Sequence, residues 1–248
     1  MHWDFALILL FLGVAVPLLG RRRVKQLLRS PATTKVNRLS LYASTIAFQW
    51  TAAGIVLWRT AAHGISGSRL GLTIGNPVFT IAIAFIISIV VLFNQVFSLR
   101  RLASRPSEVD GTLSQIAFRI FPQDDTERLA FFALVATVSV CEELIYRGFV
   151  QRVFQQWSGG SVFVGIVGSA IYFSLAHLYQ GRRGLVSTFA AGLIFSGVRA
   201  WSGSLLPSMV AHFIADITVG LLAPAKMRLG SMHAELPTPV RARGEFSD

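Results

Sequence analysis

Three charged residues interrupt an apolar stretch, SVCEELIYRGF, that runs from Ser139 to Phe149. Glu143 and Arg147 are four residues apart, so on a helix they share one face in the acid-first order that favours an ion pair. Such a pair can serve simply as structural glue between helices. Glu142 is rotated by about 100° from Glu143 and has no basic residue four positions later. It must find a partner on another helix, stay protonated or contact water.

Two later apolar segments carry histidines in similar patterns. His212 and Asp216 are four residues apart, so the carboxylate can hold an imidazole N–H and fix the tautomer. Phe173 and His177 also share a helix face. Ionisable groups inside a membrane each cost about 2.5–3.5 kcal/mol and usually mark functional sites. One histidine near the end of a span is more often a satisfied interfacial residue. Three apolar segments with ionisable residues in one half of the chain, however, indicate a functional site.

The elements that position these residues are membrane spans. The chain has 248 residues, of which 53% are hydrophobic and 14% charged, whereas soluble domains carry about 25% charged residues. Runs of roughly 18 or more apolar residues can cross a bilayer as helices. We therefore expect an all-α fold, a polytopic transmembrane helical bundle with about seven spans, over 3–19, 39–58, 78–99, 128–150, 162–179, 184–200 and 205–222. Thr126 is the expected N-cap of the fourth span, whose helix can continue to Trp157.

The distribution of charge predicts partners and orientation. The net charge of +11 fits basic residues that meet membrane lipid headgroups, and no basic stretch is interleaved with stacking aromatics as nucleic-acid binding would require. The segment 20–38 carries seven Lys or Arg and 59–76 carries two. The positive-inside rule then puts the N-terminus outside and the C-terminus in the cytoplasm. The single cysteine, Cys141, excludes an intrachain disulfide and fits a buried small hydrophobe.

Three motifs follow one another along the second half of the chain. They are EELIYR at 142–147, FSLAH at 173–177 and HFIAD at 212–216. In this order on successive membrane helices they resemble the CPBP family, the CAAX prenyl endopeptidase and bacteriocin-processing (Abi) family of intramembrane proteases. The resemblance covers about residues 128–220. It divides the chain into 1–126, with three spans and a cytoplasmic loop; 127–223, a CAAX-protease-like catalytic core; and 224–248, a disordered tail.

The resemblance implies an intramembrane glutamic endopeptidase. Glu142 is then the general base, and it activates a water together with His177. His212 and Asp216 stabilise the oxyanion, while the site is supported by Glu143, Arg147 and Phe173. Asp216 replaces the family's usual Asn, and because an ionised carboxylate cannot donate a hydrogen bond, it either orients His212 or acts protonated.

Two other functions and one other chemistry stay open beside a cofactor-free endopeptidase. Buried Glu, His and Arg also serve membrane transporters and proton relays, and a catalytically silent member of the same fold is a further alternative. No cofactor is expected, with zinc as the alternative because two Glu and two His could bind it, although HExxH is absent. The expected partners are membrane lipid and, as substrate, a peptide or protein C-terminal segment. The expected location is the bacterial plasma membrane.

One geometric problem accompanies this hypothesis. At 1.5 Å per residue, Glu142 and His212 are expected at similar depths, nearer the outer face. His177 is expected nearer the inner end of its span. A shared site therefore requires tilted or broken helices, a deeper fifth span or a different topology.

Overall fold

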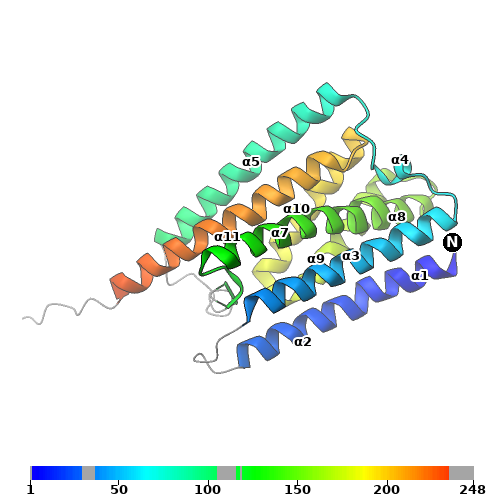
Figure 1. Ribbon diagram of the computed structural model, residues 1–248. Helices are drawn as coiled ribbons and strands as arrows, with labels where there is room; N and C mark the ends of the chain where they lie inside the picture. Colours follow the sequence, from blue (N-terminus) through cyan, green and yellow to red (C-terminus); the bar gives the residue numbers. More distant parts are fainter. Residues whose placement is uncertain (1, 30–36, 105–115, 118, 235–248) are drawn as a thin grey trace, which may run out of the picture.

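The computed structural model describes residues 2–29, 37–104, 116–117 and 119–234. Within these ranges the chain forms helices and turns and no strand, and the all-α prediction is confirmed. The helices lie in a bundle with the chain reversing direction from one to the next (Figure 1). They are α1 (Trp3–Leu10), η1 (Phe11–Ala15), α2 (Val16–Arg29), α3 (Arg38–Ala62), α4 (Gly67–Leu70), α5 (Pro77–Ser104), α7 (Asp125–Glu142), η3 (Glu143–Val150), α8 (Gln151–Trp157), α9 (Val162–Ala176), η4 (Leu178–Gln180), α10 (Gly181–Ser202) and α11 (Leu206–Ala234).

The expected spans correspond to these helices. Five helical segments of the described chain are long and apolar enough to cross a membrane: Trp3–Arg29, Arg38–Ala62, Pro77–Arg101, Asp125–Trp157 and Leu178–Ser202. Val162–Ala176 and Leu206–Leu222 are shorter apolar helices. Five long and two short elements are compatible with the predicted seven.

Some helix ends differ from the predicted ones. The first helix continues through its basic residues to Arg29, and α11 continues to Ala234. The N-cap of α7 is Asp124 and not Thr126, because the Asp124 carboxylate accepts from the Glu127 N–H at 2.8 Å. The Thr126 prediction was wrong because an acid two residues earlier satisfies the free N–H groups of the first turn better.

The helical hairpin formed by α7–η3–α8 and α9 resolves the expected depth conflict. The first arm runs without a break to Trp157, fifteen residues beyond Glu142, and α9 returns for 15 residues before His177. Each path is about 22 Å at α-helical rise. Because α8 and α9 pack side by side, equal paths from the turn bring Glu142 and His177 to the same level.

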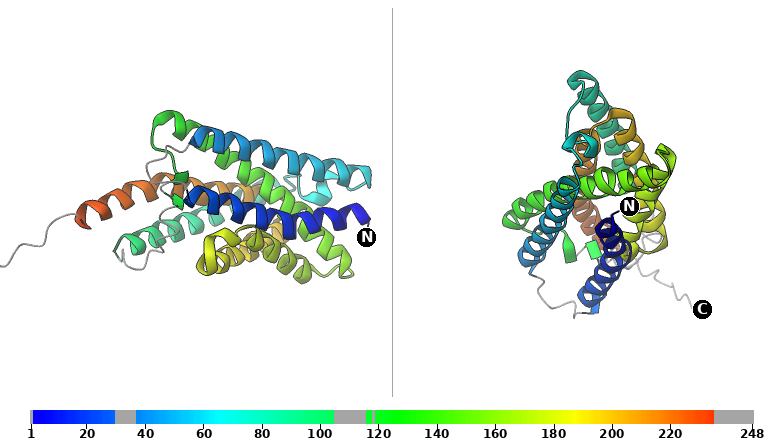
Figure 2. Two further views of the ribbon diagram at one scale, coloured as in Figure 1. Left: turned by 90° about the horizontal axis from the view of Figure 1, so that it is seen from below. Right: turned by 90° about the vertical axis from the view of Figure 1, so that its right-hand side faces the viewer.

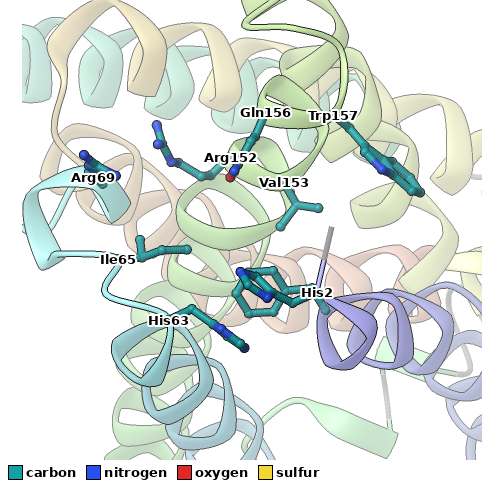
Figure 3. Close-up of a pocket in the computed structure, with 9 residues that line it drawn as sticks. His2, His63, Ile65, Arg69, Arg152, Val153, Gln156 and Trp157 are labelled. Atoms are coloured by element: carbon teal, nitrogen blue, oxygen red, sulfur yellow. The ribbon is translucent and has the colours of Figure 1, made fainter.

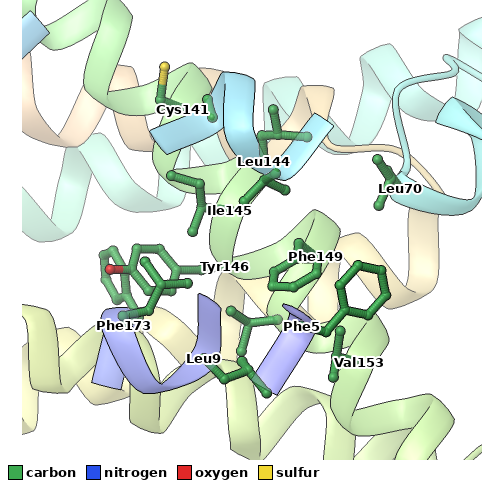
Figure 4. Close-up of a cluster of buried hydrophobic side chains, with 14 of the residues drawn as sticks. Phe5, Leu9, Leu70, Cys141, Leu144, Ile145, Tyr146, Phe149, Val153 and Phe173 are labelled. Atoms are coloured by element: carbon green, nitrogen blue, oxygen red, sulfur yellow. The ribbon is translucent and has the colours of Figure 1, made fainter. Parts of the chain in front are cut away.

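The hydrophobic core surrounds η3. Its buried members come from α1, α3, α4, η3 and α9 and include Phe5, Leu9, Leu144, Phe149 and Phe173 (Figure 4). Cys141 belongs to this cluster and is fully buried, as predicted from its apolar surroundings. By contrast, α5 packs chiefly along α11 at the edge of the bundle (Figure 2). The densest packing is therefore around the segment that carries the adjacent glutamates.

Glycines permit two of the close contacts between helices. A Cβ on Gly192 would come within 2.9 Å of the Ala170 Cα, and one on Gly165 within 2.9 Å of the Gln151 carbonyl oxygen. Real Cβ atoms do not approach backbone so closely, so only glycine lets α9 pack this tightly between α8 and α10. Gly197 faces open space and has no such role.

Candidate active site

A π-helical segment begins at the glutamate pair. Glu142 is the last residue of α7, and Glu143 opens η3, a π-helix of eight residues, all of them buried. A π-helix is rare and is found most often at functional sites, because its wider turn re-aims side chains that a regular α-helix would space evenly. The two glutamates accordingly enter different surroundings although they are neighbours in sequence.

Glu143 is the centre of a buried polar network. Its Oε1 lies 2.9 Å from Arg147 Nη1 and accepts a hydrogen bond from His212 Nδ1 at 2.9 Å. Both Glu143 and Arg147 are within 1% of full burial. The predicted Glu143–Arg147 pair is confirmed, and it joins η3 to α11 through His212. Because Nδ1 of His212 donates to the Glu143 carboxylate, Nδ1 carries a proton.

Aromatic rings complete the surroundings of Arg147. Its approach to Glu143 is an ion pair without hydrogen-bond alignment, and none of its guanidinium nitrogens has a hydrogen-bond acceptor among the described residues. The guanidinium instead lies 4.0 Å from the ring centroid of Phe173 and 5.5 Å from that of Phe195. Cation–π attraction of this kind is strongest where water is excluded, so Phe173 takes part in holding the buried cation.

Glu142 faces a cavity instead of a cation. Gln49 of α3 donates from Nε2 to Glu142 Oε1 at 2.8 Å, whereas Oε2 has no hydrogen-bond partner among the described residues. Both side chains line a cavity of about 100 Å³, and His177 lines it too. A water needs only about 10–15 Å³ of such volume and two to four polar partners. The carboxylate therefore has one oxygen held by Gln49 and one buried oxygen without a partner among the described residues, in a side chain that lines a cavity large enough for a water.

The orientation of His177 is also defined. The residue follows the last turn of α9, and its Nδ1 lies 2.8 Å from the Phe173 carbonyl oxygen. A carbonyl oxygen only accepts, so Nδ1 carries the proton, and Nε2 of the neutral ring is left as an acceptor. The tautomer thus presents a basic nitrogen on the side of the ring away from the helix end.

His212 and Asp216 belong to the adjoining network. His212 Nε2 lies 3.6 Å from Asp216 Oδ2, beyond hydrogen-bond range, and neither residue is among those of the described chain that line the Glu142 cavity. Phe173 connects the two groups, because its ring centroid is 4.6 Å from that of His177 and 5.9 Å from that of His212. The structure thus brings Glu142 and His177 to one cavity and sets His212 behind a shared phenylalanine.

The contact that α3 makes with Glu142 through Gln49 was not predicted from the sequence. Gln49 was not singled out, because a neutral amide inside a span costs less than an acid or histidine and gives no charge signal. Tyr146 and Tyr179 also line the cavity, and aromatic residues are too common in spans to mark a site by themselves. Gln49 is a polar residue in the otherwise apolar stretch IAFQW, and this was the available signal. Only the three-dimensional structure shows that its side chain contacts Glu142.

The described residues contain no group of three or more His, Cys, Asp or Glu side chains arranged to hold a metal ion. Glu143 is engaged by Arg147 and His212. The expectation of a site that works without a cofactor stays a prediction, with zinc as the alternative.

A comparison with protein families matches this part of the chain. Residues 125–218 fit the family model described as "Type II CAAX prenyl endopeptidase Rce1-like". This segment is similar to the Rce1-like family. Its match begins at the first residue of α7 and ends within α11, and so includes all three motifs. Comparisons with curated proteins and with solved structures give no match.

The match confirms the family that the three motifs predicted, and it supports a hydrolase of the protease class in a membrane. Gln49 lies outside the matched segment 125–218 yet contacts Glu142 within it. The preceding helices thus complete the cavity of this segment.

Proposed function

We propose that this chain is an intramembrane glutamic endopeptidase in which Glu142 and His177 activate a water molecule for attack on a peptide bond. The observation that carries the proposal is their common cavity of about 100 Å³, together with a Glu142 Oε2 that is buried without a hydrogen-bond partner among the described residues. A base must lie within hydrogen-bond reach of the proton that it takes, directly or through one water. A carboxylate and an imidazole acceptor around one small cavity meet this requirement.

The reaction needs only the residues of the site and water. Glu142 takes one proton from the water, the hydroxide oxygen bonds to the substrate carbonyl carbon, and the carbonyl oxygen becomes an oxyanion. The proton then passes from Glu142 to the amide nitrogen, the C–N bond breaks, and an acid and an amine leave. His177 Nε2 accepts a hydrogen bond from the same water and orients it, while Gln49 fixes the carboxylate by its 2.8 Å contact.

The network behind the cavity supports this arrangement. His212 is the proposed oxyanion donor through Nε2, since Nδ1 is occupied by Glu143. Asp216, 3.6 Å from that nitrogen, is the carboxylate that stabilises a protonated His212 and not itself a donor. Glu143, Arg147 and Phe173 hold His212 and His177 at fixed positions, because each contacts at least one other member of the network.

The proposed substrate is the C-terminal segment of a peptide or protein that reaches the membrane. The family description names a CAAX prenyl endopeptidase, so a segment with a prenylated cysteine is one class to test. The proposed location is a bacterial plasma membrane with the N-terminus outside, which follows from the basic linker at 20–38.

The deciding experiment compares wild-type protein with Glu142→Ala and His177→Ala in proteoliposomes. A pool of synthetic peptides, with and without a prenylated cysteine near the C-terminus, is incubated with each, and products are identified by mass spectrometry. Cleavage by the wild type that both substitutions abolish, at equal membrane incorporation, supports the proposal. Cleavage that survives Glu142→Ala removes Glu142 as the base, and an ion flux that depends on Glu142 without any cleavage would instead favour a transporter.

A further inference from the structure

A second and larger cavity lies at the end of the bundle that carries the N-terminus. Its volume is about 290 Å³, and it is lined by residues that include His2, His63, Arg69, Arg152 and Trp157 (Figure 3). These residues come from the start of α1, the turn after α3, α4 and α8. None of them lines the Glu142 cavity, so this is a separate place in the molecule.

Two arginines, Arg69 and Arg152, and no carboxylate are among the described residues that line the cavity, and Arg199 lies next to it. Arg199 of α10 donates from Nη2 to the Arg69 carbonyl oxygen at 3.2 Å and lies close enough to Arg152 for mutual repulsion. The Nε atoms of Arg152 and Arg199 are both buried and have no hydrogen-bond acceptor among the described residues. Like charges brought together in this way are unfavourable unless an anion enters between them.

The neighbouring carboxylate does not neutralise these arginines. Asp4 Oδ2 accepts from Arg59 Nε at 2.7 Å and lies 2.9 Å from His63 Nε2. Its partners are therefore Arg59 and His63, and His63 in turn stacks on His2 with ring centroids 3.6 Å apart. The carboxylate orders the imidazole side of the cavity and leaves Arg69 and Arg152 for another anion.

Tryptophans give the depth of the cavity in the membrane. Trp3, Trp58, Trp157 and Trp201 are each at least 57% exposed. They lie at the start of α1 and near the ends of α3, α8 and α10, and these helix ends meet at the same end of the bundle through contacts such as Arg59–Asp4 and Arg199–Arg69. Exposed tryptophans of this kind mark the lipid headgroup level. Trp157 itself lines the cavity, so the arginines lie at the depth of lipid phosphates.

We propose that this cavity binds the phosphate of an anionic phospholipid headgroup, held by Arg69 and Arg152 beside the stacked His2 and His63. Arginine matches a phosphate with two parallel N–H donors, and such charge-assisted bonds are about twice as strong as neutral ones. Phe5 lines the cavity and packs edge-on against Phe149 of η3, with centroids 5.1 Å apart. A bound headgroup therefore ties α1, α4 and α8 together next to the core that supports the glutamates.

The test measures lipid binding and does not depend on any peptidase activity. Full-length protein in detergent is titrated with dioleoyl phosphatidylglycerol or dioleoyl phosphatidylcholine, and bound lipid is counted by native mass spectrometry. We expect one phosphatidylglycerol to bind the wild type at least about 10-fold more tightly than it binds the R69Q/R152Q variant. The control variant R22Q/R29Q removes the same charge from exposed positions on α2 and should keep the wild-type affinity for this lipid.

Three results would overturn the proposal. They are equal phosphatidylglycerol binding by wild type and R69Q/R152Q, an equal loss in R22Q/R29Q, and phosphatidylcholine binding as tight as phosphatidylglycerol. Inorganic phosphate at the same concentrations separates the two sources of phosphate. The unfolding temperature of the protein is measured with the lipid and with inorganic phosphate. If inorganic phosphate raises the unfolding temperature as much as the lipid does, the site is reassigned to free phosphate. If R69Q/R152Q does not fold, R152Q alone is measured and should weaken phosphatidylglycerol binding several-fold.

Discussion

Glu142 and Glu143 are the same residue type at adjacent positions, yet their surroundings are opposite. Glu143 is fully buried, and its Oε1 is shared by Arg147 and His212. Glu142 is half-buried, receives one hydrogen bond from a neutral amide, has no partner for its second oxygen among the described residues, and lines a cavity. The difference separates two tasks, because a carboxylate bound by two cationic or donor groups holds a structure together, whereas one with a free oxygen can exchange a proton with water.

The largest expected effect comes from Glu142→Gln. The amide keeps the size of the side chain and can retain a contact with Gln49, but it cannot take a proton. General-base catalysis is worth about 10²- to 10⁴-fold, and the cleavage rate should fall by that factor. Thermal unfolding in detergent should match that of the wild type, since no buried ion pair is lost. Activity near the wild-type level would assign the base to another residue.

Glu143→Gln is the converse substitution and should act on stability. Removing one partner of a buried pair leaves the other charge uncompensated, at a cost of about 3–5 kcal/mol. The measurement is the unfolding temperature in detergent, with Glu142→Gln as the matched control of identical chemistry one residue away. In the double variant E143L/R147M both charges are gone, so part of the lost stability should return. The contrast between the glutamates would fail if Glu143→Gln unfolded no earlier than Glu142→Gln.

Gln49→Leu sharpens the role of the hydrogen bond that holds Glu142. A hydrogen bond to a charged group contributes about 1.5–3 kcal/mol, so kcat/KM should fall by about 10- to 100-fold with little change in unfolding temperature. Thr51→Ala is the control, because Thr51 is exposed on the same helix and its hydroxyl donates only to the Ala47 carbonyl oxygen. A rate for Gln49→Leu equal to that of the control would show that the carboxylate needs no help from α3.

The smallest expected effect is that of a metal chelator. If Glu142 and His177 act on water directly, dialysis against EDTA or 1,10-phenanthroline should leave the peptide cleavage rate unchanged. Inactivation by both chelators, reversed by added Zn²⁺, would support the zinc alternative and would make Glu142 a ligand instead of a base.

Much of this arrangement could be predicted because charge inside an apolar helix is costly and therefore visible in a sequence. The spacing of Glu143 and Arg147 predicted their ion pair, and the three motifs predicted the family that the 125–218 match confirms. The span count followed from apolar length. These features depend on local spacing, which the helix repeat converts directly into geometry.

The parts that could not be predicted depend on contacts between distant segments. Nothing local links Gln49 to Glu142, 93 residues away, and the depth of His177 depends on the packing of α8 against α9, which no local spacing predicts. His2 and His63 each lie outside the predicted spans, so nothing in their spacing indicates a site, yet they stack on one another beside Asp4. Contacts between residues far apart in the sequence depend on tertiary packing, which the spacing of residues along one helix does not predict.

The π-helical geometry of η3 has one further consequence. An isolated peptide covering 125–157 has no neighbours to favour the wide turn and would relax to a regular α-helix, the commoner hydrogen-bonding pattern. The part of the peptide after Glu143 would then rotate relative to the part before it. The peptide would no longer present Glu143 in the orientation that meets His212 of α11 in the full chain. The reactive geometry is in this sense a property of assembly: the carboxylates acquire their separate environments only after the surrounding helices have docked.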